Sequence, residues 1–222
     1  MKKRASEHYF EEIGENFDRW MSEYDVERRI KLLQKFLPQE ARTMSCLEVG
    51  CGTGKISEAI KPLVGELTVS DVSKGLAESV GTQLRVDWMQ SDACKLDIPD
   101  NTYDLVVSSE CIEHTSAPKT AIREMVRVMA KGGTIIVTSP NRLWYPALWA
   151  SQKLGVRNFE GNELWLYPWE AANVLSDSGV EQVMIGVCHL FPWQIPGAKR
   201  VLPFFDIIVS CIRLRLIMEY SV

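Results

Sequence analysis

Residues 47–54 read Leu-Glu-Val-Gly-Cys-Gly-Thr-Gly, and this glycine-rich stretch decides the fold prediction. An apolar run, residues 43–49, leads into it, and a segment with helical spacing, residues 55–63, follows it. Glycines at such a strand-to-helix junction let the backbone turn tightly and let a ligand approach main-chain N–H groups. The stretch therefore predicts the first strand and the first helix of an α/β domain, with a ligand site at the turn between them.

Strand-like and helix-like segments alternate from residue 43 onward, which is typical of a parallel sheet with crossover helices. After the first strand, further strands are expected at residues 67–70, 85–90, 103–108, 134–138, 180–187 and 214–220. Helices are expected at residues 55–63, 74–80 (capped by Ser73), 117–130 and 169–178. The predicted fold is a Rossmann-like, doubly wound, mostly parallel seven-stranded sheet whose last strand is antiparallel.

The whole chain, residues 1–222, is predicted to form a single domain with additions. Residues 1–42 are expected to form an N-terminal helical cap of two amphipathic helices, at residues 5–24 and 26–36, and residues 43–140 the cofactor-binding core. Residues 141–169 carry several Trp and Tyr with little strand character, which indicates a substrate cap inserted over one edge of the sheet. Residues 170–222 are assigned to the C-terminal part of the sheet.

Composition limits the classes of function. The chain has 222 residues, of which 46% are hydrophobic and 24% charged, and a formal net charge of -4. These values are typical of a soluble globular protein, and no basic tail favours nucleic-acid binding. No apolar run approaches the ~18 residues of a membrane span. Six cysteines without C-x-x-C spacing, and a basic start followed by Glu7 rather than an apolar stretch, favour free thiols in the cytoplasm.

Spacing discriminates between the ligands that glycine turns hold. The dinucleotide fingerprint G-x-G-x-x-G needs a small residue where this chain has Lys55. A phosphate-binding P-loop would need glycine at position 49 and Ser or Thr at position 56, where the chain has Val49 and Ile56. The remaining pattern, E-x-G-x-G-x-G, suits a ligand that carries an amino acid. Glu48 would attract an ammonium group while the glycine N–H groups face a carboxylate.

Two further carboxylates follow predicted strands. Asp71 comes 21 residues after Gly50, where an acceptor for a ribose diol is expected. Asp92, followed by Ala93, is placed to meet an adenine edge. The alternative for both aspartates is a turn or helix-cap carboxylate.

These segments together resemble the class I S-adenosylmethionine-dependent methyltransferases. The resemblance rests on LEVGCGTG at 47–54, Asp71, SDA at 91–93 and YDLVVSSECIEH at 103–114, and it covers residues 43–140. Within that class, the chain is similar to the small-molecule branch that includes the ubiquinone and menaquinone biosynthesis methyltransferases. The resemblance implies S-adenosylmethionine as the methyl donor and S-adenosylhomocysteine as the product.

The resemblance also implies a role for each matching residue. Glu48, Gly50 and Gly52 would hold the methionine portion of the cofactor, and Asp71 would hydrogen-bond the ribose hydroxyls. Val72 would lie against the adenine, Asp92 would accept from the adenine amino group, and Ala93 would contribute its backbone. Ser109 would border the sulfonium.

The E-x-x-E-H segment, formed by Glu110, Glu113 and His114, follows the strand at 103–108. A neutral His114 imidazole could take the proton of a substrate hydroxyl. Alternatively, Glu110 and Glu113 would share a helix face and, with His114, hold a divalent metal, as in similar metal-dependent ubiquinone-pathway O-methyltransferases. A third interpretation makes Glu113 and His114 a hydrogen-bonded pair at a helix start. We assign His114 and Glu113 as catalytic and assign no metal ligand, so a divalent metal stays an alternative.

The acceptor class follows from missing signatures. The chain has Ser108-Ser109-Glu110-Cys111 where nucleic-acid amino-methyltransferases carry N/D-P-P-Y/F and cytosine C5 enzymes carry Pro-Cys. We therefore predict a small-molecule or lipid-like acceptor, methylated at oxygen, with no nucleic-acid partner and with peripheral membrane contact left open. A non-catalytic S-adenosylmethionine-binding partner subunit is the alternative, and Lys55 disfavours a nicotinamide-dependent oxidoreductase.

Overall fold

A parallel sheet forms the centre of the protein in the computed structural model, which describes residues 23–146, 149, 153 and 163–185. In the described chain the sheet has five strands in the order β3-β2-β1-β4-β5, and every neighbouring pair is parallel. The strands are β1 (Ser45–Val49), β2 (Glu66–Asp71), β3 (Asp87–Gln90), β4 (Tyr103–Ser109) and β5 (Met129–Thr138). The α-helices are α2 (Glu23–Phe36), α3 (Lys55–Ile60), α4 (Lys74–Leu84), α5 (Pro118–Val128) and α7 (Pro168–Asp177). Short 3-10 helices span Ala41–Thr43, Lys61–Leu63, Ile112–His114 (η4) and Arg142–Trp144 (η5).

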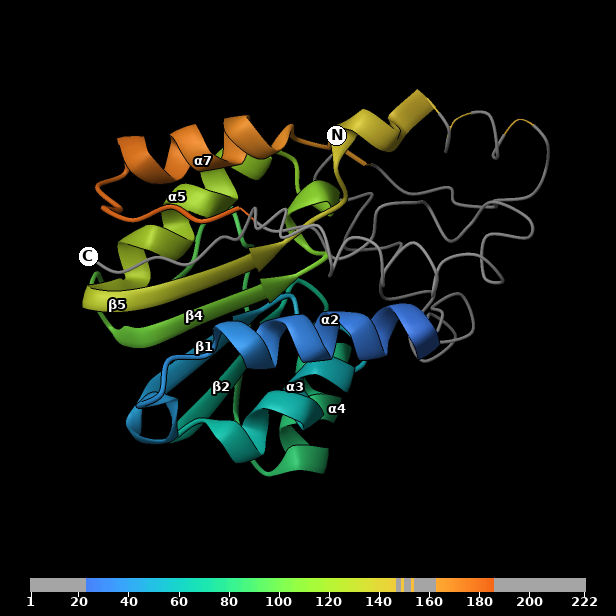
Figure 1. The fold of residues 1–222 in the computed structure, drawn as a ribbon. Helices are drawn as coiled ribbons and strands as arrows, with labels where there is room; N and C mark the ends of the chain where they lie inside the picture. Colours follow the sequence, from blue (N-terminus) through green and yellow to red (C-terminus); the bar gives the residue numbers. More distant parts are fainter. Residues whose placement is uncertain (1–22, 147–148, 150–152, 154–162, 186–222) are drawn as a thin grey trace.

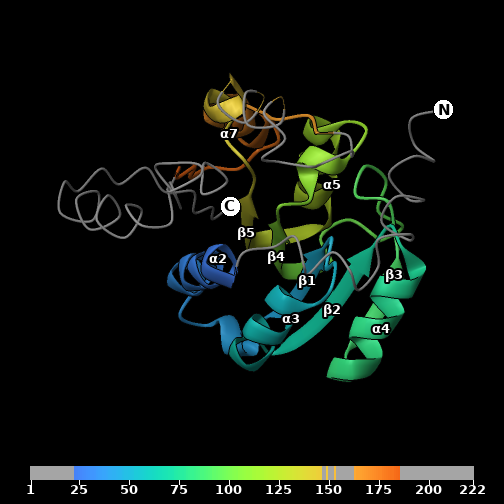
Figure 2. The same cartoon turned by 90° about the vertical axis from the view of Figure 1, so that its right-hand side faces the viewer.

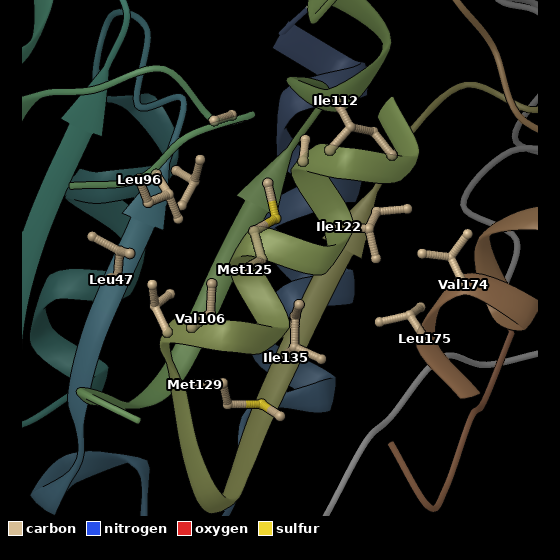
Figure 3. Close-up of a cluster of buried hydrophobic side chains, with 14 of the residues drawn as sticks. Leu47, Leu96, Val106, Ile112, Ile122, Met125, Met129, Ile135, Val174 and Leu175 are labelled. Carbon is tan, nitrogen blue, oxygen red and sulfur yellow. The ribbon is translucent and has the colours of Figure 1, made fainter. Parts of the chain in front are cut away.

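Helices cover both faces of the sheet, as Figures 1 and 2 show. Successive residues of a strand point to opposite faces, so Leu47 packs in the cluster under α5 and α7, whereas Cys46 packs in the cluster that includes Leu33 and Phe36 of α2. Figure 3 shows the first of these clusters, in which Met125 of α5 faces the sheet. Both faces of the central strands are therefore buried, which explains their nearly continuous apolar sequences.

The strand order confirms the predicted Rossmann-like arrangement. The order of the strands in the sheet departs from their order in the sequence between β1 and β4. These two strands are neighbours in the sheet, although β2 and β3 lie between them in the sequence. In open α/β sheets ligands bind outside the carboxyl ends of the strands at such a switch point. The glycine turn after β1 and the E-x-x-E-H segment after β4 both lie at this edge.

The helix boundaries follow local sequence chemistry. The predicted helix cap at Ser73 is confirmed, because the Leu76 amide donates to the Ser73 hydroxyl at 3.3 Å. Arg85, in the left-handed region with a φ of 54°, ends α4. The helix predicted at residues 26–36 lies within α2, which begins at Glu23.

Two predicted boundaries differ from the structure. The strand expected at residues 134–138 begins at Met129, and the preceding helix ends at Val128 instead of running to residue 130. Met129 pairs with Tyr103 and Thr134 with Leu105, so residues 130–133 form a bulge opposite Asp104. Gly132 occupies this bulge with a φ of 78°, which explains why the glycine pair interrupts the strand pattern without ending the strand.

The C-terminal strands and the caps lie largely outside the described residues. Residues 180–185 belong to the predicted strand 180–187 but form no strand, because the Val180 amide instead donates to the Leu175 carbonyl and closes the end of α7. The strand predicted at 214–220 and the helix at 5–24, apart from its last two residues, fall outside the described chain. So does much of the aromatic cap at 141–169. Among the described residues, no helix is both long and apolar enough to cross a membrane.

Candidate functional site

The glycine turn after β1 is held in shape by the neighbouring strand. The amides of Gly50 and Cys51 donate to the Ser70 carbonyl at 2.8 and 3.0 Å. Gly50, Gly52 and Gly54 have φ values of 78°, 53° and 85°, a region that favours glycine. The turn therefore depends on glycine for its backbone shape.

The three glycines face different surroundings. A Cβ on Gly50 would lie 2.3 Å from the Cys111 sulfur, and a Cβ on Gly54 would lie 2.9 Å from the Val80 side chain. A Cβ on Gly52 would meet no atom within 4 Å. Gly50 and Gly54 thus permit close packing of the protein itself, whereas Gly52 has open space beside its Cα. The amides of all three glycines donate to protein acceptors, so the expectation that the glycine N–H groups face a ligand carboxylate is wrong.

Asp71 ties the end of β2 to the glycine turn. Its Oδ2 accepts from the Gly52 amide at 2.9 Å, and its Oδ1 accepts from the Ser73 amide at 2.9 Å. Burial raises the pKa of this carboxyl, and the amide hydrogen bonds oppose the shift. Each carboxylate oxygen can accept more than one hydrogen bond, so the predicted ribose contact stays available to Asp71.

Glu48 lies in β1, two residues before Gly50, and its carboxyl is buried. Its side chain is 1% exposed, and its Oε2 has no hydrogen-bond partner in the described structure. Burial raises the Glu48 pKa to about 8, the nearby Ser57 hydroxyl opposes the shift, and Asp71 adds to it. Glu48 is therefore mostly protonated at neutral pH, and an approaching cation would favour its ionised form.

The residues predicted to meet the adenine lie next to β2 and β3. Asp92 forms a local turn, in which its Oδ1 accepts from the Cys94 amide at 2.9 Å. Ala93 is buried, and the partly buried Val72 offers its carbonyl to the Gln90 side chain at 3.1 Å. The structure thus shows the turn-carboxylate role for Asp92, and its contact with adenine stays a prediction.

Hydroxyl groups secure the strand ends around this edge. Ser109 is the residue predicted to border the sulfonium. Its hydroxyl lies 2.9 Å from the Thr138 hydroxyl, at the ends of β4 and β5. Ser70 donates to the Glu48 carbonyl and Ser108 to the Val49 carbonyl, both at 3.0 Å. Ser70 and Ser108 were not predicted from the sequence to have these roles, although a small hydroxyl residue at the end of a buried strand is a visible signal.

The E-x-x-E-H segment differs from the predicted helix. Glu110 has a φ of 53° and its amide donates to the Thr138 carbonyl at 2.9 Å, while η4 begins only at Ile112. Glu110 and Glu113 therefore do not share a helix face, because a left-handed residue separates β4 from η4. In the described part of the chain, no group of three or more His, Cys, Asp and Glu side chains is placed to hold a metal ion.

Glu113 and His114 form a pair beside the same edge. His114 Nε2 lies 3.8 Å from Glu113 Oε1, and the side chains are 15% and 1% exposed. Neither carboxyl oxygen of Glu113 has a hydrogen-bond partner in the described structure. Burial raises the Glu113 pKa to about 8 and Glu163 adds to this shift, whereas the Ser139 hydroxyl and Arg29 oppose it.

Three residues near Glu113 were not assigned to the site from the sequence, although Leu164 and Trp165 lie in the predicted cap at residues 141–169. The Leu164 amide donates to the Glu113 carbonyl at 2.7 Å, which brings the segment before α7 over η4. Trp165 beside it is buried, with no hydrogen-bond partner for its Nε1 in the described structure. Arg29 is 8% exposed on α2, and its spacing from the buried Val26 and Leu33 on the same helix was the signal that could have identified it.

The described cysteines are free thiols, as predicted. They are Cys46, Cys51, Cys94 and Cys111. Burial raises the pKa of the Cys111 thiol far above its usual range, and the nearby Asp71 and Glu113 add to the shift. Cys111 is therefore a neutral packing residue rather than an activated nucleophile.

Known proteins are similar to this chain in sequence. Residues 47–137 match the family described as methyltransferase domain. The chain is 35% identical over 108 residues to ajmaline N-methyltransferase from Rauvolfia serpentina, covering 45% of this chain and 37% of that protein. It is 32% identical over 164 residues to the ubiquinone/menaquinone biosynthesis C-methyltransferase UbiE of Roseobacter denitrificans, covering 70% of this chain and 63% of that protein.

A solved structure shares the fold. The chain matches a SAM-dependent methyltransferase of Thermotoga maritima with a TM-score of 0.64 and 21% identity, over 82% of this chain and 86% of that one. The chain spans less than two thirds of the length of either curated relative named above. The matched residues 47–137 include the glycine turn, Asp71 and the E-x-x-E-H segment.

Proposed function

Because the chain belongs to the class I S-adenosylmethionine-dependent methyltransferases through its domain at residues 47–137, we propose that it transfers the methyl group of S-adenosylmethionine to a small-molecule acceptor at oxygen. The observation that carries the proposal is the junction of Glu48, the open Gly52 and Asp71 at the switch point of the sheet. S-adenosylhomocysteine is the second product.

The protein's own residues fit the two ends of this cofactor. A buried Glu48 carboxyl with a free oxygen suits the ammonium group of the methionine portion, and Gly50 and Gly52 would lie against its carboxylate. Asp71, already fixed by two amides, would present its remaining lone pairs to the ribose hydroxyls. The adenine would lie between Val72, Asp92 and Ala93, and Ser109 would border the sulfonium.

Alignment is the main contribution that methyl transfer requires from the protein, because the sulfonium is already activated. In the proposed step the acceptor oxygen forms a bond to the methyl carbon as the sulfur–carbon bond breaks. The hydroxyl proton passes to the His114 imidazole. Glu113, whose Oε1 lies 3.8 Å from Nε2, would orient the ring. A divalent metal is not needed for this proton transfer.

Oxygen as the methylated atom rests on the chain's own residues. The two curated relatives are named as N- and C-methyltransferases, so the relationship does not decide the atom. A half-buried imidazole paired with a buried carboxyl suits the removal of a hydroxyl proton. We further propose that the acceptor is a small or lipid-like molecule rather than a nucleic acid, and that the protein acts in the cytoplasm, where free thiols persist.

A non-catalytic partner subunit that binds the same cofactor is the second candidate. Only the residues proposed to hold the cofactor support this candidate, because a subunit that binds the cofactor without turnover would need them too. The Glu113–His114 pair, buried at a cost in free energy, has no purpose in a protein that only binds the cofactor.

The test is a turnover assay. The purified protein would be incubated with S-adenosylmethionine and a panel of hydroxyl, amine and activated-carbon acceptors, with magnesium or with a chelator. Formation of S-adenosylhomocysteine with a methyl ether as product, lost in His114→Asn, supports the proposal. N- or C-methylated products alone would contradict oxygen transfer. Cofactor binding without turnover on any acceptor would favour the partner subunit.

A further inference from the structure

Large apolar side chains that are exposed to solvent gather in one stretch of the described chain. They are Leu143, Tyr145, Trp149, Leu164 and Trp169, with exposed fractions between 41% and 59%. Soluble proteins rarely leave such side chains together on the surface unless the surface binds something. With the cations Arg142 and Lys153, we name these residues the aromatic surface.

A hydrogen bond and two ring contacts join the parts of the aromatic surface. The Arg142 amide donates to the Leu166 carbonyl at 3.2 Å, so the chain after β5 lies beside the chain before α7. The rings of Tyr167 and Trp169 stack with centroids 4.5 Å apart. The Tyr145 ring meets the edge of the buried Trp165 at 5.9 Å, which anchors the surface to the core.

A helical spacing extends the surface. Tyr145, Trp149 and Lys153 are four residues apart, and each is in helical conformation. Residues at this spacing lie on one side of a helix. Figure 1 shows the helical turns directly after β5 near the start of α7, on the side of the molecule where the strands end. The Trp149 and Lys153 side chains thus continue the surface that begins at Tyr145.

The two cations of the aromatic surface each lie over an aromatic ring. The Arg142 guanidinium lies 5.1 Å from the Tyr167 ring, and the Lys153 ammonium lies 5.9 Å from the Trp149 ring. The nearby Glu170 is paired with Lys119 at 2.8 Å, so part of its charge is neutralised. Trp and Tyr with basic residues are the side chains that occupy the headgroup zone of a membrane, where phosphates bind the cations.

We propose that the aromatic surface docks on a phospholipid bilayer that contains anionic lipid. The rings enter the headgroup zone, and Arg142 and Lys153 contact lipid phosphates. A second copy of the chain fits less well, because a two-fold contact would collect four cations, Arg142 and Lys153 of both copies, in one interface. The surface adjoins the proposed active site through the Leu164–Glu113 hydrogen bond, so docking would place that site near molecules dissolved in the membrane.

The test is sedimentation of the full chain with vesicles of phosphatidylcholine alone or of phosphatidylcholine mixed with phosphatidylglycerol. No cofactor or acceptor is present, so the result is independent of the proposed methyl transfer. We expect binding to the anionic vesicles, weakened at least tenfold in the double variant Trp149→Ser/Trp169→Ser. Lys153→Gln should weaken it about fivefold, the equivalent of ~1 kcal/mol per basic residue near the surface. The matched control Lys74→Gln, on the exposed side of α4, should bind as wild type.

Three outcomes would overturn the proposal. One is absence of binding to anionic vesicles by the folded protein. Another is binding that the double tryptophan variant leaves unchanged, which would place the contact in another segment. The third is a dimer in solution that the same variant converts to a monomer, which would make a second copy of the chain the partner. Circular dichroism of each variant checks that it is folded.

Discussion

Cys111 fills the space in which Gly50 would carry a side chain. A Cβ on Gly50 would lie 2.3 Å from the Cys111 sulfur and 2.6 Å from its Cβ. The two residues belong to the turns after β1 and β4, the neighbouring strands at the switch point. This close packing limits how far apart the two turns can lie, and the cofactor is proposed to bind at these turns.

The first prediction compares how tightly the protein packs around two glycines of the same turn. Gly50→Ala adds a clash with Cys111 to the cost of a positive φ, whereas Gly52→Ala meets only the second cost. We expect Gly50→Ala to lower the free energy of unfolding by about 3 kcal/mol and Gly52→Ala by about 1 kcal/mol. Urea unfolding followed by circular dichroism measures both. Equal losses in the two variants would show that the Cys111 contact is relieved at little cost.

A second prediction concerns Arg127, which fastens the loop before β4 to α5. Its guanidinium donates to both oxygens of Glu124 at 2.9 Å, to Asp100 at 2.6 Å, and to the carbonyls of Leu96 and Ile98. A lysine ammonium cannot reproduce this planar set of donors. Arg127→Lys should therefore lower the free energy of unfolding by about 2 kcal/mol.

The exposed Arg123 on the same helix provides the control for Arg127. Arg123→Lys should change the free energy of unfolding by less than about 0.5 kcal/mol. Thermal or urea unfolding of the two variants under the same conditions gives the comparison. If the two substitutions had the same effect, the fan of hydrogen bonds around Arg127 would not contribute to stability.

A third prediction concerns pH. Burial raises the pKa values of Glu48 and Glu113 from 4.5 to about 8. Between these values the folded protein retains protons that the unfolded chain has released. The free energy of unfolding should therefore fall as the pH rises through this window, by up to about 1.4 kcal/mol per pH unit for each carboxyl.

Carboxamide variants check the sign of this pH dependence. Glu113→Gln and Glu48→Gln each remove one titrating group, so each should make the fall in unfolding free energy shallower. Glu66→Gln, an exposed residue of β2, serves as the control and should leave the slope unchanged. Unfolding free energies that rise between about pH 5 and about pH 8 would contradict the burial of protonated carboxyls.

Much of the fold was predictable because the decisive residues act locally. The glycine turn, the Ser73 cap and the apolar strands each need only a few neighbouring residues, and the structure confirms them. Residues 130–133 were misjudged because the glycines there form a bulge opposite Asp104, and that pairing depends on a distant strand.

The candidate site was harder to predict in detail. Sequence spacing placed Glu110 and Glu113 on one helix, but the left-handed Glu110 lies before η4 begins. The surroundings of Glu113 come from α2, from the end of β5 and from the segment before α7, which are far apart in the sequence. Local patterns could locate Glu113 at the strand edge, but they carried no information on its burial.

A fourth prediction tests the acceptor half of the site. In the turnover assay, His114→Asn should lower kcat by about 100-fold or more, the usual contribution of a positioned base. Cofactor affinity should not change, because His114 is assigned to the acceptor. Glu113→Gln should shift the pH dependence of kcat, since it removes the carboxyl beside Nε2. Ser116→Ala, two residues along the chain, is the control, and an unchanged kcat in His114→Asn would refute the proposed base.

The central claim is that the glycine turn and Asp71 hold S-adenosylmethionine. Calorimetric titration of the metal-stripped protein with S-adenosylmethionine, with S-adenosylhomocysteine and with NAD tests it most directly. We predict micromolar binding of both sulfur compounds, weakened about tenfold or more in Asp71→Asn and unchanged in Asp87→Asn at the exposed start of β3. Failure of the folded protein to bind S-adenosylmethionine, or tighter binding of NAD, would contradict it.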